Sequence, residues 1–531
     1  MEHFSKVNNS TNTIPKGVPP VHFVGDCAEE FETALLNAPW TVSEVVEAVG
    51  RLPKGKASGP DGILNEHLMQ SGAVLPHVTA LLNACLEQGR VPVDWRKCLL
   101  TVIPRSKGNL GDPKNWRGIA KRNVLGKLLS SLVAQRLEDY LSYRDLIPPE
   151  QHGFARGKST LSAVGVLLKK IKETCYGPGR NKTPVYAVFI DYRSAFDLAS
   201  RSVIVEKLAC AGVSGGMLHL IHDMLQLGWV SLEDGASELA PFPQTNGVAQ
   251  GDNLSPKLFN VLLSDLPVAI SRDHDIVYTL LYADDAVLYS CSEIYLQRAL
   301  RTLERYSASN GLIINVEKTK VMKFGVGGTP TKKLALRLGA NVVEVVSHFD
   351  YLGMTLCQRG VAVSRHVASR IRKARLAFGS IPTPRVLSLK TALALFDMKI
   401  APIASYGIGI VWDELPVTQL DAFDKLKASF LRLALGVHRS SRNLTRIRHE
   451  TLAPDALDPI ILEKAAAVDS TTLGRLGLSH MQTLTSLTGL ARSSRCTRIS
   501  TAQDLIILRD ALNSIAVRNS RRSGRMHLQR L

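Results

Sequence analysis

Two short apolar stretches that end in aspartates constrain the fold of this chain more than any other feature. Residues 185–190 (VYAVFI) are rich in β-branched and aromatic side chains, and Asp191 follows directly. Residues 276–289 contain two apolar runs that meet at Asp284 and Asp285, a pattern that predicts a β-hairpin. Helical periodicity fits between and after these strands, so we expect an α+β fold in which the strands carry the acids.

Carboxylates gathered at the ends of neighbouring strands suit hard divalent cations. Mg²⁺ is bound by one or two carboxylates together with substrate phosphates, and two ions about 3.5–4 Å apart stabilise the attacking and leaving oxygens in phosphoryl transfer. Asp191 and Asp284 meet this requirement, whereas Asp285 is expected to point differently because strand side chains alternate. An Asp-Asp pair in a hairpin is by itself ordinary turn chemistry, so the other blocks of the sequence must support the site.

The charge balance favours a nucleic-acid partner. The chain has 531 residues, 65 Lys and Arg against 47 Asp and Glu, and a net charge of +18, which attracts polyanions. Its eight cysteines form no CxxC pair, which argues against a zinc finger and for a reducing compartment. No stretch is apolar enough to span a bilayer and no secretory signal is visible, so we expect no membrane contact and a nuclear or cytoplasmic location.

Eight sequence blocks occur in a fixed order, and together they resemble the reverse transcriptase domain of non-LTR (LINE-type) retrotransposons. Three of them are similar to the family's motifs A, B and C, namely FIDYRSAFD (189–197), GVAQGDNLSPKLFN (247–260) and YADD (282–285). The others are KGKASGPDGI (54–63), IPRSKGNLGDPKNWRGI (103–119), QHGFARGKST (151–160), GLIINVEKTKVM (311–322, like motif D) and FDYLG (349–353, like the primer grip).

The resemblance implies a right-hand polymerase with fingers, an antiparallel palm sheet with helices, and a mainly helical thumb. The expected parts are a flexible lead-in (1–34), an N-terminal extension with fingers (35–185), a palm with motifs A to E (186–357), a thumb (358–450) and a basic helical C-terminal extension (451–531). The implied activity is RNA-directed DNA synthesis, in which a DNA primer is extended with dNTPs on an RNA template. Two Mg²⁺ ions are implied, with Mn²⁺ able to substitute. The oligomeric state stays open.

The resemblance also implies roles for the acidic and basic residues of the palm. Asp191 and Asp284 would hold the metal ions with Asp285 beside them. A motif D lysine would protonate the leaving pyrophosphate. The sequence offers Lys318, our first choice, and Lys320, and does not decide between them.

Five further residues would form the nucleotide pocket. Phe196 would be the steric gate beneath the sugar, where its ring would clash with a ribose 2′-OH and so favour deoxynucleotides; it is equally expected to pack in the core. Gln250 and Gly251 would line the pocket. Lys107 and Arg117 would bind the incoming triphosphate, because Arg makes bidentate phosphate contacts and Lys acts as a point charge.

The last part of the resemblance concerns primer and duplex binding. Tyr351, Leu352 and Gly353 would place the primer end. Residues 364–378 predict an amphipathic helix with Val367, Ile371 and either Ala374 or Phe378 facing inward. Its basic side chains would project toward a nucleic-acid backbone, namely Arg365, Arg370, Arg372, Lys373 and Arg375.

Two departures and three alternatives remain at this point. The family often has Arg-Pro where this chain has Arg117-Gly118, and Ser or Cys where it has Asp252; neither change removes a catalytic group. The alternative of a different class is a catalytically inactive, retroelement-derived nucleic-acid-binding protein. An RNA-dependent RNA polymerase fits less well because Phe196 is bulky, and a group II intron maturase fits the set of blocks less well.

Overall fold

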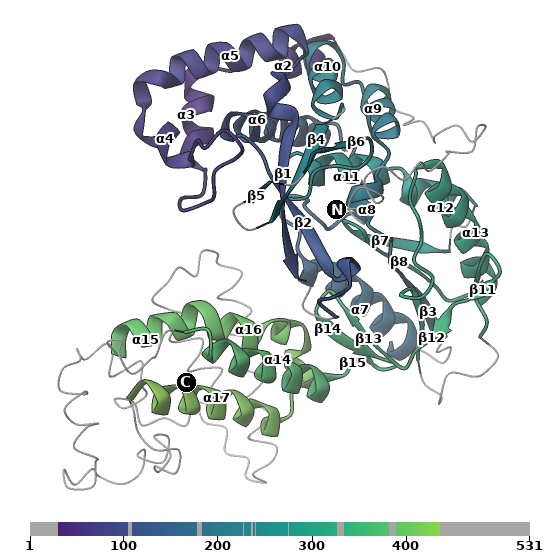
Figure 1. Cartoon of the computed structure of the whole chain (residues 1–531). Helices are drawn as coiled ribbons and strands as arrows, with labels where there is room; N and C mark the ends of the chain where they lie inside the picture. The colour runs from purple at the N-terminus through teal and green to yellow at the C-terminus, as the bar shows by residue number, and fades with distance from the viewer. Residues whose placement is uncertain are drawn as a thin grey trace, which may run out of the picture. The chain divides into compact units, whose positions relative to one another are not determined.

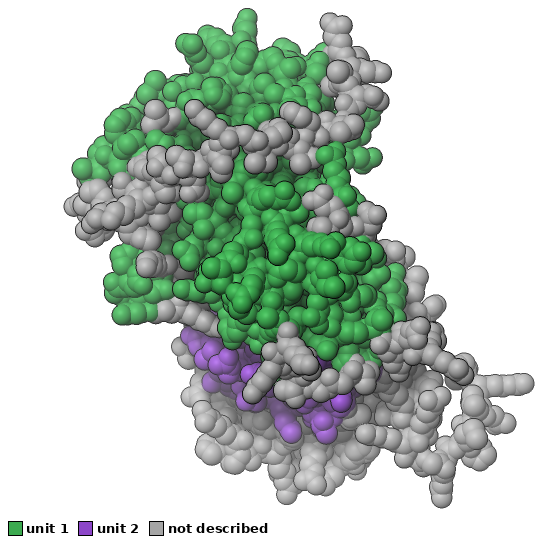
Figure 2. Space-filling view, turned by 90° about the vertical axis from the view of Figure 1, so that its right-hand side faces the viewer, with its two compact units in different colours: residues 1–349 green, residues 350–531 purple. Residues whose placement is uncertain are grey.

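The computed structural model describes residues 30–104, 109–177, 183–226, 228–234, 237–238, 240–273, 276–325, 334–381 and 389–435. The chain forms two compact units, residues 1–349 and 350–531, which Figure 2 colours green and purple. Most of the expected lead-in and the whole expected C-terminal extension lie outside the described residues. In the described part of the chain, no helix combines the length and the apolar character needed to cross a bilayer.

The central sheet of the first unit has five strands in the order β12-β9-β3-β8-β7. They are β3 (Val185–Ile190), β7 (Tyr278–Tyr282), β8 (Asp285–Ser290), β9 (Lys320–Phe324) and β12 (Glu344–Val345). β3 runs antiparallel to both β8 and β9, and β7 and β8 form a hairpin. The predicted strand before Asp191 and the predicted hairpin at Asp284 are therefore both present, and they are immediate neighbours (Figure 1).

β3 is the centre of this sheet because it is apolar on both faces. All six of its residues are buried, as expected for a continuous apolar run covered on both sides. The helices α7 (Thr160–Tyr176), α12 (Leu266–Asp273) and α13 (Glu293–Ser309) pack against the strands of this sheet. The sheet and its helices thus hold the end of β3, and Asp191 after it, in a rigid setting.

A second sheet joins parts of the chain that the sequence analysis placed in different domains. Its order is β2-β1-β4-β5, and β6 also pairs with β4. The strands are β1 (Lys97–Pro104), β2 (Trp116–Lys121), β4 (Gly228–Asp234), β5 (Ser237–Glu238) and β6 (Phe242–Gln244). β4 lies parallel to β1, so residues within the expected palm range complete the sheet of the expected fingers.

The remaining elements of the first unit are mainly helical. The sequence Thr41-Val-Ser-Glu44 has the pattern of a capping box. The box is present, since Thr41 accepts a hydrogen bond from the backbone N–H of Glu44, and the Glu44 carboxylate accepts one from the N–H of Thr41. The helices are α2 (Glu30–Asn37), α3 (Val42–Gly50), α4 (Asn65–Gln70), α5 (Leu75–Gln88), α6 (Val124–Tyr143), α8 (Ala195–Leu198), α9 (Arg201–Cys210), α10 (Gly215–Met224) and α11 (Ser255–Leu263). Short elements are η1 (Gly72–Val74), η2 (Val93–Arg96), η3 (Pro113–Asn115), β10 (Arg337–Leu338) and β11 (Asn341–Val342).

Two expectations about these helices were wrong. The lead-in was expected to extend to residue 34, but α2 begins at Glu30. The Asn37 amide ties the end of this helix to α10, since it donates to Ser214 O and accepts from Met217 N. The pair Ser255-Pro256 is typical of an N-cap followed by the first helical residue, but Ser255 is itself the first residue of α11. No side chain caps this helix, and the Asp252 carboxylate accepts the N–H of Leu254, the residue that precedes it.

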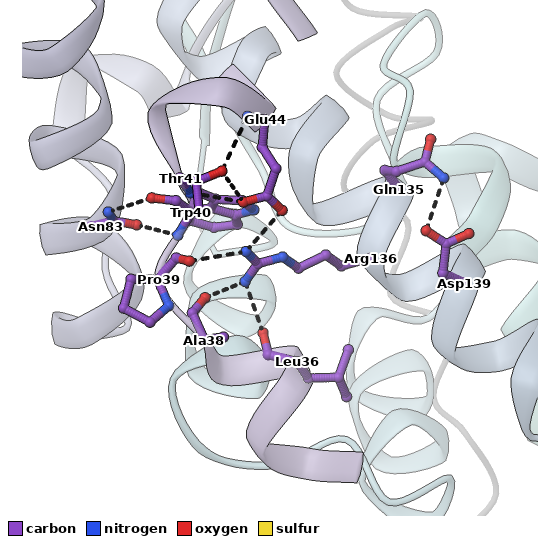
Figure 3. Close-up of polar contacts among 10 residues, drawn as sticks. All are labelled: Leu36, Ala38, Pro39, Trp40, Thr41, Glu44, Asn83, Gln135, Arg136 and Asp139. Carbon is purple, nitrogen blue, oxygen red and sulfur yellow. Dashed lines mark hydrogen bonds and ion pairs between the residues drawn. The ribbon is translucent and has the colours of Figure 1, made fainter. Parts of the chain in front are cut away.

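Arg136 fastens the N-terminal helices to α6. Its guanidinium donates to the backbone carbonyls of Leu36, Ala38 and Pro39 and pairs with Glu44 at 3.2 Å. It also stacks over the Trp40 ring at 4.7 Å. Figure 3 shows these contacts converging on one side chain, whereas the neighbouring Gln135 makes only an exposed contact with Asp139.

The second unit is a small sheet followed by helices. Its strands are β13 (His348–Tyr351), which begins in the first unit, β14 (Met354–Cys357) and β15 (Gly360–Val361). The helical elements are α14 (Val363–Phe378), α15 (Leu389–Leu395), η4, a π-helical turn (Phe396–Ile400), α16 (Ala401–Ser405), η5 (Ile408–Glu414) and α17 (Val417–Leu435). The predicted inward face of α14 is confirmed, since Val367, Ile371 and Ala374 are buried.

Candidate active site

The carboxylates of motifs A and C meet at one end of the central sheet. The β3–β8 ladder pairs Ile190 with Ala286, so Asp191 and Asp285 are the next residues on the two strands. Burial against surrounding protein atoms, and after it the negative charges of Asp284 and Asp191, together raise the pKa of the Asp285 carboxyl to about 7. The two other carboxylates therefore both lie close enough to repel it.

The turn that carries Asp284 has a strained backbone. Tyr282 and Asp285 pair across the hairpin, which leaves only Ala283 and Asp284 to reverse the chain. Ala283 has a φ of +53°, a conformation that a residue with a Cβ adopts at a cost of about 1–3 kcal/mol and that recurs at functional sites. Its neighbours must therefore hold the turn in place.

Two residues that the sequence analysis did not assign hold Asp191. Asn315 donates from its amide nitrogen to Asp191 Oδ2 at 3.0 Å and from its backbone N–H to the Asp191 carbonyl at 2.7 Å. Thr319 accepts the Asp191 backbone N–H at 3.3 Å and donates to the Asn315 carbonyl. Both lie in GLIINVEKTKVM, so the block was recognised although the roles of its members were not. This loop orients the first carboxylate.

The two candidate lysines of the same block differ in their surroundings. Lys318 places its Nζ 3.8 Å from Asp191 Oδ2, and its side chain is 64% exposed. Lys320 is turned toward Glu344, whose Oε2 lies 2.7 Å from Nζ, and it also bonds the Glu317 carbonyl. The structure thus brings Lys318, rather than Lys320, next to the carboxylates.

The donor set fits a divalent cation that shares its coordination with a substrate. Within the described residues, no group of three His, Cys, Asp or Glu side chains is arranged as a complete metal centre. The carboxylates of Asp191 and Asp284 could supply hard oxygen ligands, and Mg²⁺ characteristically combines one or two such ligands with phosphate oxygens. A site of this kind is completed by a nucleotide rather than by the protein alone.

Motif B runs alongside both the palm and the β1–β2 sheet. Phe196 is half-buried and stacks on Phe259, with ring centroids 4.7 Å apart, and its carbonyl accepts the Val248 N–H at 2.8 Å. Gln250 accepts the Ala120 N–H of β2 through its carbonyl at 3.0 Å, and Gly251 has a φ of +104°. The backbone of motif B is therefore fixed between the two sheets.

The structure says less about the two residues that were expected to bind the triphosphate. Arg117 lies on β2 with an exposed side chain, and Lys107 lies outside the described residues. Asp252 stands where the family often has Ser or Cys, and the structure gives it local partners. Its carboxylate pairs with Arg122 and accepts a hydrogen bond from the Ser130 hydroxyl at 3.1 Å. Asp252 thus joins motif B to α6 and the loop before it.

In the second unit, the expected primer-grip residues form a tight hairpin turn between β13 and β14. Leu352 and Gly353 have φ values of +44° and +80°, as a two-residue hairpin turn with both central residues in the left-handed region requires. Tyr406 donates its hydroxyl to the Leu352 carbonyl at 2.6 Å, and Arg370 donates to the Gly353 carbonyl. Tyr351 is buried.

The basic face of α14 corrects one expectation. Arg370 was expected to project outward, but its guanidinium stacks 4.2 Å from the Tyr406 ring centroid and bonds the primer-grip turn. It therefore stabilises the turn instead of facing solvent freely. The other four basic residues of the predicted set, Arg365, Arg372, Lys373 and Arg375, are exposed as expected.

The comparisons with known proteins identify a family for the middle of the chain. Residues 104–356 match the family described as reverse transcriptase (RNA-dependent DNA polymerase). A probable RNA-directed DNA polymerase from transposon BS of Drosophila melanogaster is 30% identical over 400 residues, covering 72% of this chain and 43% of that protein. The Pol polyprotein of the type-1 retrotransposable element R2 of Popillia japonica is 30% identical over 316 residues, covering 56% and 42%.

Other matches are more distant. The RNA-directed DNA polymerase of the mobile element jockey of Drosophila melanogaster is 25% identical over 400 residues, 72% of this chain and 42% of that protein. Among solved structures, a C-terminally truncated apo telomerase from Candida tropicalis has a TM-score of 0.35 at 13% identity, covering 55% of this chain and 59% of that one. The chain thus spans less than half the length of the curated relatives named here.

The family match covers motifs A to D and every residue of the central sheet's strands. The expected α+β fold of a right-hand polymerase is confirmed, since the matched residues combine helices with a mainly antiparallel sheet that ends in the paired acids. Members of this family generally use divalent metal ions. Residues 104–356 of this chain thus form a reverse transcriptase domain, and the relatives named above include polymerases of non-LTR retrotransposons.

Proposed function

We propose that this chain is an RNA-directed DNA polymerase of a LINE-type retroelement, which extends a DNA primer with dNTPs on an RNA template. The observation that carries the proposal is the meeting of Asp191, Asp284 and Asp285 at the end of one mainly antiparallel sheet, with Lys318 beside Asp191. The names of the relatives support the same reaction. We place it in the nucleus or cytoplasm, where its nucleic-acid partners occur.

The chemistry follows from the residues at this edge. Asp191 and Asp284 would hold two Mg²⁺ ions, for which Mn²⁺ can substitute, with Asp285 next to them. Such ions stabilise the negative charge on the attacking and leaving oxygens of phosphoryl transfer. Asn315 keeps Asp191 in a fixed orientation, and Arg117 and Lys107 would bind the triphosphate.

The proposal is tested by primer extension on a defined RNA template. A DNA primer annealed to a heteropolymeric RNA is incubated with the purified chain, four dNTPs and Mg²⁺, and the product is sequenced. We expect a DNA strand complementary to the RNA. A chain that binds the annealed pair and adds no nucleotide with either Mg²⁺ or Mn²⁺ would instead be a binding protein.

Lys318 is proposed as the general acid that protonates the leaving pyrophosphate. Because general acids contribute about 10²–10⁴-fold to rate, we expect Lys318→Ala to lower the single-turnover rate about 100-fold at the lower limit of that range. Lys320→Ala is the matched control, since Lys320 is engaged by Glu344, and it should stay within a few-fold of wild type. Equal losses of rate in Lys318→Ala and Lys320→Ala would contradict the assignment of Lys318 as the general acid.

Phe196 is proposed as the steric gate against ribonucleotides. We expect Phe196→Ala to reduce the preference for dTTP over UTP by at least about tenfold, because a pocket that excludes one small group discriminates by this order. Phe259→Leu is the control, since it disturbs the same ring stack from the buried side. Unchanged preference in Phe196→Ala, or the same loss in Phe259→Leu, would show that Phe196 only packs.

The second unit is proposed to contact the primer and the duplex. The turn at Leu352 and Gly353 would place the primer end, and the exposed basic residues of α14 would contact phosphates. Such contacts release counterions, so affinity for a primer–template pair should fall steeply as salt rises.

A further inference from the structure

A buried glutamine lies directly behind the turn that carries Asp284. Gln151 is 1% exposed and its backbone forms a parallel bridge with Leu281 of β7. The adjoining backbone is tied in the same way: His152 N–H donates to the Leu281 carbonyl at 2.7 Å, and Leu281 N–H donates to the Glu150 carbonyl at 2.9 Å. The segment 150–152 therefore runs along β7 up to the hairpin turn.

The side chain of Gln151 binds the turn itself. Its Oε1 accepts the backbone N–H of Ala283 at 3.1 Å and the backbone N–H of Gly153 at 2.8 Å. Both partners are donors, so the amide can have only the orientation that points its oxygen at them. Its Nε2 is buried and has no hydrogen-bond partner among the described residues. A buried amide donor is seldom left unpaired. Because Nε2 makes no hydrogen bond there, the contribution of the side chain lies in the two hydrogen bonds that Oε1 accepts.

Gly153 brings the same segment into direct contact with the turn. A Cβ at this position would lie 2.2 Å from Ala283 N, so only glycine allows the backbones to approach this closely. Asn260 of α11 donates to the Gly153 carbonyl at 2.9 Å. Gln151, Gly153 and Asn260 therefore support the turn from one side. Among the described residues, the side chain of Gln151 supplies the only side-chain acceptor for the Ala283 N–H.

The geometry points to Gln151 as a positioning residue for polymerisation: we propose that it fixes the Ala283 amide, and so keeps Asp284 aligned with Asp191. Ala283 holds a φ of +53°, a conformation that the turn would relax if its amide were released. A misplacement of about 1 Å at a reacting centre costs on the order of 100-fold in rate. This inference rests on the proposed function.

The test compares three substitutions. Gln151→Leu keeps similar volume and removes the acceptor, whereas Gln151→Glu retains an acceptor oxygen at the same reach. Gln135→Leu is the matched control, because Gln135 is an exposed glutamine of α6 whose side chain contacts only Asp139 (Figure 3). Two properties are measured for each: hydrogen exchange of the peptide 278–286, and kcat and KM for dTTP on poly(rA)–oligo(dT).

We expect Gln151→Leu to speed exchange in this peptide and at Gly153, whose amide loses the same acceptor, but not elsewhere in the first unit. We also expect it to lower kcat about 100-fold, with the KM for dTTP changed by less than about threefold. Gln151→Glu should recover protection and most of the rate, and Gln135→Leu should match wild type. Should Gln151→Leu fail to fold, Gln151→Asn gives the same test, because its oxygen is one methylene too short to reach Ala283.

Three results would overturn the proposal: wild-type exchange and kcat in Gln151→Leu, equal impairment in Gln151→Glu, or faster exchange throughout the first unit. The exchange measurement also separates this inference from the proposed function. If the wild-type chain extends no primer, while Gln151→Leu loses protection at the turn and Gln151→Glu keeps it, the role of Gln151 in holding the turn stands and the polymerase proposal fails.

Discussion

Asp284→Asn is expected to abolish nucleotide addition while leaving primer–template binding unchanged. The substitution keeps the size of the side chain and one acceptor oxygen, but it replaces the other oxygen with an amide nitrogen and removes the negative charge that favours a divalent cation. A bound cation supplies several kcal/mol of transition-state stabilisation, so the loss in rate should be about 10³-fold or more. Single-turnover extension and a gel-shift assay on the same primer–template pair measure the two effects.

Asp139→Asn is the matched control for this substitution, because Asp139 lies on the exposed side of α6 and contacts Gln135. A second readout is independent of catalysis. Ca²⁺ should raise the melting temperature of wild type and of Asp139→Asn, because a ligand that binds only the folded state stabilises it. The same shift should be reduced in Asp284→Asn. Unimpaired extension by Asp284→Asn would refute the metal assignment.

Lys207→Met is expected to cause the largest loss of stability. Lys207 is 2% exposed, and its Nζ lies 2.6 Å from Asp265 Oδ1, 2.6 Å from the Leu262 carbonyl and 3.1 Å from the Tyr306 hydroxyl. Burial, together with the negative charge of Asp265, holds the pKa of Tyr306 well above its usual value. Removing the ammonium leaves Asp265 buried without its counter-charge, which costs about 3–5 kcal/mol.

Urea denaturation monitored by circular dichroism measures this loss. Lys169→Met is the control, since Lys169 is exposed and lies 4.0 Å from Glu173, and such surface pairs contribute at most about 1 kcal/mol. The double substitution Lys207→Met with Asp265→Leu should recover much of the stability, because replacing both charges removes the unpaired one. A single substitution as stable as wild type would contradict the importance of the pair.

The strands that carry the acids could be predicted because their signal is local. Residues 185–190 are apolar and β-branched throughout, and this is the composition of a strand buried on both faces. The hairpin at Asp284 follows from two such runs separated by a short turn. The helix at residue 42 was likewise predictable, since the capping box lies within four residues.

The contacts that the sequence did not reveal join residues far apart in the chain. β4 pairs with β1 across more than a hundred residues, Lys207 pairs with Asp265, and Arg370 reaches back to the Gly353 carbonyl. From sequence alone, a charged residue in a helical pattern is expected to face solvent. Only the folded chain shows which carboxylate or carbonyl it pairs with. Local periodicity contains no information about such partners.

The same limit applies to the active site. The resemblance identified the blocks and assigned Asp191, Asp284 and Lys318, but it did not separate Lys318 from Lys320. Their positions relative to Asp191 depend on how the loop of Asn315 folds back on β3. Gln151 also lies in a recognised block, yet its contact with Ala283 exists only because the segment 150–153 packs along β7.

The most direct measurement of the central claim is incorporation of labelled dTTP on poly(rA)–oligo(dT) by the purified chain in Mg²⁺, beside Asp284→Asn under identical conditions. The account predicts extended oligo(dT) with the wild-type chain and none with the variant, although both bind the template. Equal incorporation by both proteins, or none by a wild-type chain that binds the template, would contradict it.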